Sequence, residues 1–243
     1  MSFLTRIPVK ITDYSDKSLS HACGYFPLVG ALIGMTLAFV YWILSYFLPM
    51  EVSITLTIIF GYMLTGGFHE DGLADVADGF GGAFEKEQKL NIMKDSRLGT
   101  YGALALVSLF AIKYQSLMAL NNIPLALITA HCLSRVFATS IIGSCPYVTE
   151  SESSKVKPVA QYLPESAYIR ILFTATLLLL LILLFTTLSI GDLTIIVVSC
   201  FILQRVLIAW FKQQIQGYTG DCLGAAQQII EVIVYCLLII LLD

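Results

Sequence analysis

Five side chains that can bind a metal ion or transfer a proton lie within ten consecutive positions, inside the segment TGGFHEDGLADVADGFGG at residues 65–82. They are one imidazole, one glutamate and three aspartates: His69, Glu70, Asp71, Asp75 and Asp78. If the segment is helical, its spacings place Asp71, Asp75 and Asp78 on one narrow stripe. Like charges at these spacings repel by roughly a few tenths of a kcal/mol per pair. Beside lipid, where desolvation adds to this repulsion, the stripe needs a counter-charge.

A hard divalent cation is the natural counter-charge for this stripe. Carboxylate oxygens suit Mg²⁺, which proteins usually hold with one or two carboxylates together with substrate phosphates. The segment contains no basic residue, which argues against the alternative of a solvated helix end. Paired glycines at both ends, Gly66 and Gly67 among them, allow a close backbone approach to a ligand. The pattern therefore predicts a site for metal and phosphate.

A second polar segment, MKDSRLGTYG at residues 93–102, precedes an apolar stretch. In it Lys94 and Arg97 flank Asp95. Arginine offers a planar fork for phosphate oxygens and lysine a point charge. We expect both to bind phosphate while Asp95 helps to hold the metal. The alternative is that the two basic residues only anchor the chain at the membrane interface.

Two further candidates lie elsewhere in the chain. Asp221 lies among glycines in GYTGDCLGAA at residues 217–226, either as a simple turn with a helix cap or beside backbone N–H groups that bind a nucleotide. Arg135 lies within an apolar stretch, where a charge is usually functional or paired, so we expect it to contact a substrate phosphate. His131 is expected to pack in the core, and the sequence suggests no role for Lys113.

The elements that position these residues are membrane-spanning helices. The chain of 243 residues is 57% hydrophobic and 13% charged, whereas soluble domains carry about 25% charged residues. This composition predicts an all-α, polytopic transmembrane helix bundle that forms one catalytic domain over residues 1–243. Stretches long enough to cross about 30 Å of hydrocarbon predict seven spans, at residues 28–48, 52–68, 98–120, 124–142, 167–190, 193–211 and 223–242.

Two smaller features concern how these spans are joined and packed. Gly30 and Gly34 form a G-x-x-x-G pattern, which favours close packing of two helices. The link between the fifth and sixth spans is expected to consist only of Gly191 and Asp192.

Basic residues are divided unevenly between the two ends of the spans. With seven spans, eleven of the fourteen Lys and Arg residues fall on the amino-terminal side, ten in the four segments and Arg170 at the adjacent end of the fifth span, and the three opposite loops hold none. Positive charge gathers on the cytoplasmic side of membrane proteins. We therefore expect a cytoplasmic amino terminus and a cytoplasmic active face. No basic run alternates with aromatic residues, which argues against nucleic-acid binding.

In the same order and at similar length, the three motifs resemble the cobalamin synthase family, the adenosylcobinamide-GDP ribazoletransferases. The opening FLTRIPV at residues 3–9, and GYFP before the first span, are similar to that family as well. The resemblance implies a multi-pass enzyme of the bacterial inner membrane. It implies that the enzyme joins adenosylcobinamide-GDP to alpha-ribazole, or to its 5′-phosphate, and releases GMP with Mg²⁺ as cofactor.

The resemblance and the residues together lead to a mechanistic hypothesis. Asp71, Asp75 and Asp78, with Glu70 or Asp95, hold one or two Mg²⁺ ions against the diphosphate. Lys94 and Arg97 stabilise phosphate oxygens, and His69 or an aspartate of the group removes the proton from the attacking ribose hydroxyl. Gly66, Gly67, Arg135 and Asp221 complete the substrate site.

Three questions stay open at this point. The order of residues differs from the D-x-x-D-G-x-x-A-R pattern of CDP-alcohol phosphotransferases, and Asp75 stands where that pattern has arginine, but a membrane phosphotransferase of that type is an alternative. A cation transporter that uses the aspartates as an ion site is another. Whether the enzyme acts alone, as a homo-oligomer or in a complex with other nucleotide-loop enzymes is the third question.

Overall fold

The computed structural model describes residues 4–8, 16–148, 160 and 162–242 of the chain. In these residues the regular secondary structure is α-helical, with one 3₁₀ turn and an isolated bridge between Tyr147 and Tyr218. The helices are α1 (Asp16–Cys23), α2 (Phe26–Leu44), α3 (Met50–Thr65), α4 (Phe68–Gly82), α5 (Lys86–Met93), α6 (Thr100–Ala119), α7 (Ile123–Ser140), η1 (Ile141–Gly143), α8 (Glu165–Phe185), α9 (Ile190–Ile215) and α10 (Gly220–Leu242).

Among the described residues, six helices are long and apolar enough to cross a membrane, and the pair α3 and α4 raises the number to seven if it forms one broken span. Each predicted span corresponds to one of these helices, so the prediction of a polytopic transmembrane helix bundle is confirmed. A cytoplasmic amino terminus and a single catalytic domain remain predictions.

The predicted link between the fifth and sixth spans is wrong. Helix α8 ends at Phe185, and α9 begins at Ile190. Ser189 caps α9 by accepting the N–H of Asp192 (3.2 Å), while Asp192 accepts the N–H of Ser189 (2.7 Å). This reciprocal capping box makes Gly191 and Asp192 part of the first turn of α9, and the link lies before them.

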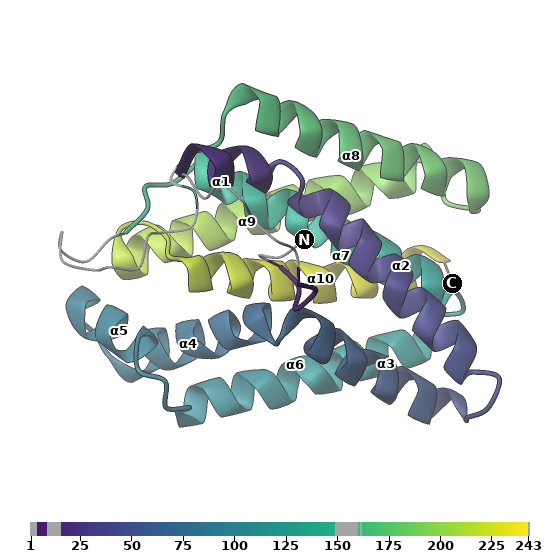
Figure 1. Ribbon diagram of the computed structural model, residues 1–243, viewed down its shortest axis with the longest axis horizontal. Helices are drawn as coiled ribbons and strands as arrows, with labels where there is room; N and C mark the ends of the chain where they lie inside the picture. The colour runs from purple at the N-terminus through teal and green to yellow at the C-terminus, as the bar shows by residue number, and fades with distance from the viewer. Residues whose placement is uncertain (1–3, 9–15, 149–159, 161, 243) are drawn as a thin grey trace.

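Helix α7 lies at the centre of the bundle (Figure 1). Of its most apolar stretch, 83% is buried by the other helices. It packs tightly against α2 through the predicted small-residue face. A Cβ atom on Gly34 would stand 2.6 Å from the Cα of Ile128, and one on Gly30 would overlap the carbonyl of His131. The prediction that Gly30 and Gly34 pack two helices together is therefore confirmed.

The helix break at Gly66 and Gly67 separates the acidic segment from the span before it. Both glycines have left-handed backbones, with φ of 72° and 67°, a conformation that glycine adopts without steric penalty. Helices α3 and α4 meet there at 89°. Figure 1 shows α4 continuing alongside α6 and α10 rather than in the direction of α3. The acidic segment is thus a helix of its own, packed inside the bundle.

Candidate active site

Helix α4 presents its polar side chains on two different faces. Asp71 is exposed and Asp75 is partly buried, whereas His69 is only 5% exposed. At 100° per residue, His69 points about 160° away from Asp71. The predicted general base and Asp71, one of the predicted metal ligands, therefore lie on opposite sides of one helix.

A close crossing of α4 and α10 brings Asp221 to the aspartates of α4. A Cβ atom on Gly72 would stand 2.9 Å from the carbonyl oxygen of Asp221, and one on Gly224 would stand 3.2 Å from the carbonyl oxygen of His69. The absence of side chains at these two positions lets the backbones meet. Asp221 and Asp71 repel the charge of Asp75 more strongly than Asp78 does.

No basic side chain pairs with Asp71, Asp75 or Asp221 in the described part of the chain. Asp221 accepts a hydrogen bond from the Thr219 hydroxyl (3.3 Å), and Thr219 in turn accepts the N–H of Cys222 at the start of α10 (3.4 Å). A helix cap, one of the two alternatives for this turn, is therefore present and is made by Thr219. The same turn places Asp221 in a group of three carboxylates to which the described residues supply no ion-pair partner.

Asp78 has a different position from the one predicted. Its two carboxylate oxygens accept the backbone N–H groups of Gly99 (2.8 Å) and Gly102 (2.9 Å). These N–H groups belong to the first turn of α6, whose positive end favours an anion. Asp78 thus joins α4 to the second polar segment. Within the described residues, no three Asp, Glu, His or Cys side chains converge as a ready-made metal site, and this holds for Asp71, Asp75 and Asp78 as it does for Asp71, Asp75 and Asp221.

The second polar segment is also arranged differently from the prediction. Arg97 donates to both oxygens of Asp95 from Nε (3.0 Å each) and again from its Nη2 atom. These hydrogen bonds lower the pKa of Asp95 to about 2. Asp95 is therefore paired with Arg97 and does not join the carboxylates of α4. The Arg97 side chain is 87% exposed, and Lys94 is exposed at the end of α5.

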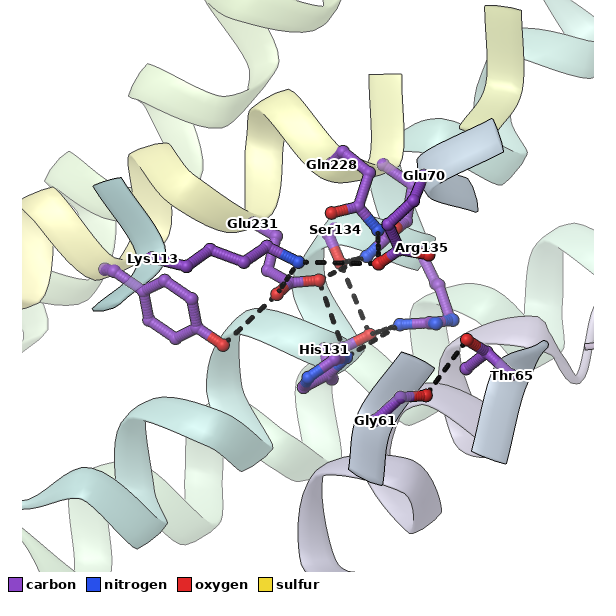
Figure 2. Close-up of polar contacts among 11 residues, drawn as sticks. Gly61, Thr65, Glu70, Lys113, His131, Ser134, Arg135, Gln228 and Glu231 are labelled. Atoms are coloured by element: carbon purple, nitrogen blue, oxygen red, sulfur yellow. Dashed lines mark hydrogen bonds and ion pairs between the residues drawn. The ribbon is translucent and has the colours of Figure 1, made fainter. Parts of the chain in front are cut away.

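A buried polar network lies on the inner side of α4 (Figure 2). Lys113 from α6 pairs with Glu231 from α10 (2.8 Å) and lies 3.7 Å from Glu70 of α4. Their side chains are 5%, 1% and 15% exposed. His131 from α7 lies 3.5 Å from Glu231. Glu70, a predicted metal ligand, therefore faces this network instead of Asp71 and Asp75.

Amide and hydroxyl groups complete the network. Gln227 donates to Glu231 (2.7 Å) and to Ser134 (2.9 Å), and Gln228 donates to Glu70 (2.9 Å). Sequence reasoning missed Glu231 and both glutamines, gave Lys113 no role and expected His131 only to pack. An ionisable residue inside the last apolar span, four residues after a glutamine, is the signal that could have found them.

Arg135 lies beside this network and lines two small cavities. The first, of about 30 Å³, is also lined by Glu70, Lys113 and Glu231. The second, of about 40 Å³, is lined by the first turns of α4 and α10 and by Leu4. His69 lines both cavities, and its imidazole makes no hydrogen bond within the described residues. The predicted base and the predicted phosphate ligand therefore line the same two small cavities.

Of the two glycines at the helix break, one remains accessible. A Cβ atom on Gly66 would overlap the guanidinium of Arg6, whereas nothing lies within 4 Å of the corresponding position at Gly67. Only Gly67 therefore has the open surroundings expected for a ligand contact.

Comparison with known proteins adds the following. A family model described as Cobalamin-5-phosphate synthase matches residues 1–239. A protein of Shewanella amazonensis is 44% identical over 247 residues, covering 99% of this chain and 93% of the relative, and one of Shewanella pealeana is 46% identical with the same coverage. Both relatives are named adenosylcobinamide-GDP ribazoletransferase. No solved structure matches the chain significantly.

Proposed function

The chain belongs to the cobalamin-5-phosphate synthase family, and from this membership we propose that it joins adenosylcobinamide-GDP to alpha-ribazole or alpha-ribazole 5′-phosphate and releases GMP. The observation that carries the proposal is the similarity to named ribazoletransferases over 99% of the chain. The multi-pass helix bundle agrees with an enzyme that works at a membrane.

The reaction is a phosphoryl transfer between two bound molecules. A ribose hydroxyl oxygen of the acceptor forms a bond to the phosphorus attached to cobinamide, the bond from that phosphorus to the GMP oxygen breaks, and the hydroxyl proton is removed. Catalysis of this type depends mainly on positioning and on neutralising charge. The protein must therefore hold a diphosphate, an acceptor and a proton acceptor close together.

We assign the diphosphate end of the site to Asp71, Asp75 and Asp221. Three carboxylates without a basic partner in the described residues offer only oxygen donors, which is the ligand chemistry that Mg²⁺ prefers. When bound there, Mg²⁺ would neutralise charge on the diphosphate and on the departing GMP. This assignment replaces Asp78, whose oxygens hold α6, and Glu70 and Asp95, whose charges are paired elsewhere.

Lys94 and Arg97 lie in the loop between α5 and α6, which Asp78 links to α4, and we propose that they bind phosphate oxygens of the substrate. The hydrogen bond from Gly99 to Asp78 keeps this loop next to the acidic helix. Because Arg97 is exposed, it is accessible to a substrate that enters from solvent. We propose an aspartate at the diphosphate end of the site, rather than His69, as the proton acceptor, because His69 points about 160° away from Asp71 and lines the two cavities on the other side of α4.

We further propose that the protein lies in the bacterial inner membrane with its amino terminus and active face in the cytoplasm. The support is the uneven distribution of basic residues. Asp71, Asp75 and Asp221, together with the loop that carries Lys94 and Arg97, would then meet the substrates from the cytoplasmic side.

The test is a reconstituted assay with the full chain in nanodiscs. We expect formation of a cobamide and GMP from adenosylcobinamide-GDP and alpha-ribazole or its 5′-phosphate. In parallel, a CDP-alcohol with lipid is offered as substrate, and cation uptake is measured in proteoliposomes. Turnover of the CDP-alcohol without cobamide formation, or cation uptake alone, would contradict the proposed function.

A further inference from the structure

The four acidic residues of α4 differ in what they contact. Asp78 accepts two N–H groups of the first turn of α6, and Glu70 accepts a hydrogen bond from Gln228 of α10 (2.9 Å). Asp71 and Asp75 have no basic partner in the described part of the chain. Two carboxylates therefore attach α4 to neighbouring helices, and two remain available to a ligand.

Glu70 is attached to α10 and α6 through a single oxygen atom. Its Oε1 accepts the Nε2–H of Gln228 (2.9 Å) and lies 3.7 Å from Nζ of Lys113. Its Oε2 has no hydrogen-bond partner within the described residues. Because Gln228 and Lys113 are both buried, water competes little for these contacts. The first turn of α4 is therefore held against α10 and α6 by the contacts of one Glu70 oxygen.

The amide of Gln228 is fixed in its turn by the centre of the bundle. Figure 2 shows it next to Glu70. Its Nε2 also donates to Oε1 of Gln227 (2.7 Å). Gln227 donates to Glu231 (2.7 Å) and to Ser134 of the central helix α7 (2.9 Å). Because Gln227 is anchored to a second helix, the donor that holds Glu70 has little freedom to move.

Glu70 lies on α4 away from the two available carboxylates. At 100° per residue, Asp71 and Asp75 differ in direction by about 40°, whereas Glu70 points about 100° from the first and about 140° from the second. The contact of Gly72 with the backbone of Asp221 limits how closely α4 and α10 approach, but a glycine offers no side chain that resists rotation of α4. At about 6 Å from the helix axis, a rotation of roughly 10° moves a side-chain atom by about 1 Å. The attachment of Glu70 supplies the missing resistance to rotation.

We propose that Glu70 is a positioning residue whose contact with Gln228 fixes the rotation of α4. In this orientation Asp71 and Asp75 can act together with Asp221 of α10. The inference rests on the proposed function, because it concerns the three aspartates that are assigned there to Mg²⁺. Since these aspartates come from α4 and α10, a contact between these two helices sets their relative positions. The hydrogen bonds between α4 and α6, in contrast, involve a helix that carries none of the three.

The experiment compares the Mg²⁺ requirement of variants of the full chain in nanodiscs. Gln228→Leu removes the donor to Glu70, and we expect the Mg²⁺ concentration for half-maximal activity to rise on the order of 10-fold, as for a small misplacement of catalytic groups. Gln204→Leu is the matched control. Gln204 is 4% exposed, against 2% for Gln228, and donates to the carbonyl oxygen of Phe137 on α7 (2.8 Å). The same substitution there removes a buried hydrogen bond between α9 and α7 and should leave the Mg²⁺ requirement unchanged.

Further variants separate positioning from metal binding and cover the case in which Gln228→Leu does not fold. Glu70→Gln keeps an acceptor oxygen for Gln228 and should retain a Mg²⁺ requirement near that of the wild type, whereas loss of the charge of a metal ligand would raise it. Glu70→Leu should raise the requirement as Gln228→Leu does, and the double variant Glu70→Leu/Gln228→Leu should raise it no further, because both changes remove the same contact. The double variant also leaves no member of this pair without its partner, which favours its folding.

Mg²⁺ binding is measured without turnover as well. MgCl₂ is expected to raise the melting temperature of the wild type and of Gln204→Leu, because an ion that binds only the folded state stabilises it. At the same concentration the rise should be smaller in Glu70→Leu/Gln228→Leu. If Glu70 had only a structural role, the double variant would melt at a lower temperature without MgCl₂ but would show the full rise with it, and this result would overturn the inference.

The outcomes separate the inference from the proposed function. An unchanged Mg²⁺ requirement in Gln228→Leu and in the double variant would overturn the inference and leave the function intact. A raised requirement in Glu70→Gln would identify Glu70 as a metal ligand and also overturn it. Absence of wild-type turnover at every Mg²⁺ concentration would overturn the proposed function, while stabilisation by MgCl₂ that depends on the contact between Glu70 and Gln228 would still support the inference.

Discussion

Gly72 of α4 lies directly against Asp221 of α10, with so little space that a Cβ atom on Gly72 would stand 2.9 Å from the Asp221 carbonyl oxygen. The two residues are 149 positions apart in the sequence, yet their contact sets the spacing between Asp221 and the aspartates of α4. The geometry of the proposed metal site therefore depends on the absence of a side chain at Gly72.

The first prediction concerns this contact. In Gly72→Ala the added methyl group must push α4 and α10 apart, so we expect kcat to fall on the order of 10- to 100-fold, as for small misplacements of catalytic groups. Gly191→Ala on α9 is the control, because the nearest atom to its new Cβ lies at an ordinary 3.4 Å. Steady-state kinetics of both variants in nanodiscs check the prediction, and wild-type activity of Gly72→Ala would refute it.

The second prediction separates Asp75 from Asp78. Asp75→Asn should lower kcat/KM on the order of 100-fold and raise the Mg²⁺ concentration needed for half-maximal activity, because it removes a proposed ligand. Chelation of Mg²⁺ with EDTA should abolish activity, and added Mg²⁺ should restore it. Glu87→Gln, at an exposed residue of α5, should leave the Mg²⁺ requirement unchanged.

The third prediction is that Asp78 stabilises the folded protein and does not bind Mg²⁺. Asp78→Asn leaves at least one N–H group of the first turn of α6 poorly satisfied, at a cost of roughly 1–3 kcal/mol. We expect a lower melting temperature but an unchanged Mg²⁺ requirement of the folded enzyme. A changed Mg²⁺ requirement without a loss of stability would contradict this prediction and indicate that Asp78 is a metal ligand.

The fourth prediction concerns the buried ion pair. Lys113→Met removes the cation that pairs directly with Glu231 and lies 3.7 Å from Glu70, and breaking a buried pair on one side costs roughly 3–5 kcal/mol. The double variant Lys113→Met/Glu231→Gln removes one charge of each sign and should be more stable than Lys113→Met alone. Thermal unfolding in detergent measures both, and equal stability of Lys113→Met and the wild type would contradict the interpretation.

The fifth prediction uses the ionisation of Asp95. Its pKa of about 2 lies below the unfolded value of about 3.9. The pair with Arg97 therefore favours the folded state above about pH 4, and this contribution is lost as the pH falls toward 2. Since Asp95 stays ionised at every higher pH, Asp95→Asn should leave the shape of the pH–rate profile between pH 5 and 9 unchanged. A lost or shifted limb of that profile would show that Asp95 titrates during catalysis.

The spans could be predicted because each needs only a local run of about 20 apolar residues. The acidic helix was likewise visible, since its charges lie within ten positions. What could not be predicted is which distant group each charge meets. Asp78 is satisfied by N–H groups 21 and 24 residues away, and Glu231 pairs with Lys113 across the bundle. Such contacts are set by helix packing, which one sequence does not reveal.

The amino-terminal segment has a practical consequence for anyone who prepares this enzyme. The backbone N–H of Arg6 donates to the carbonyl of Leu64 (2.8 Å), next to the break before α4, and Leu4 forms part of the wall of the second cavity. An affinity tag fused to this end is expected to disturb both the Arg6–Leu64 hydrogen bond and the cavity wall at Leu4. The carboxyl end of α10 lies about 34 Å along its axis from Gly220, so purification handles belong there.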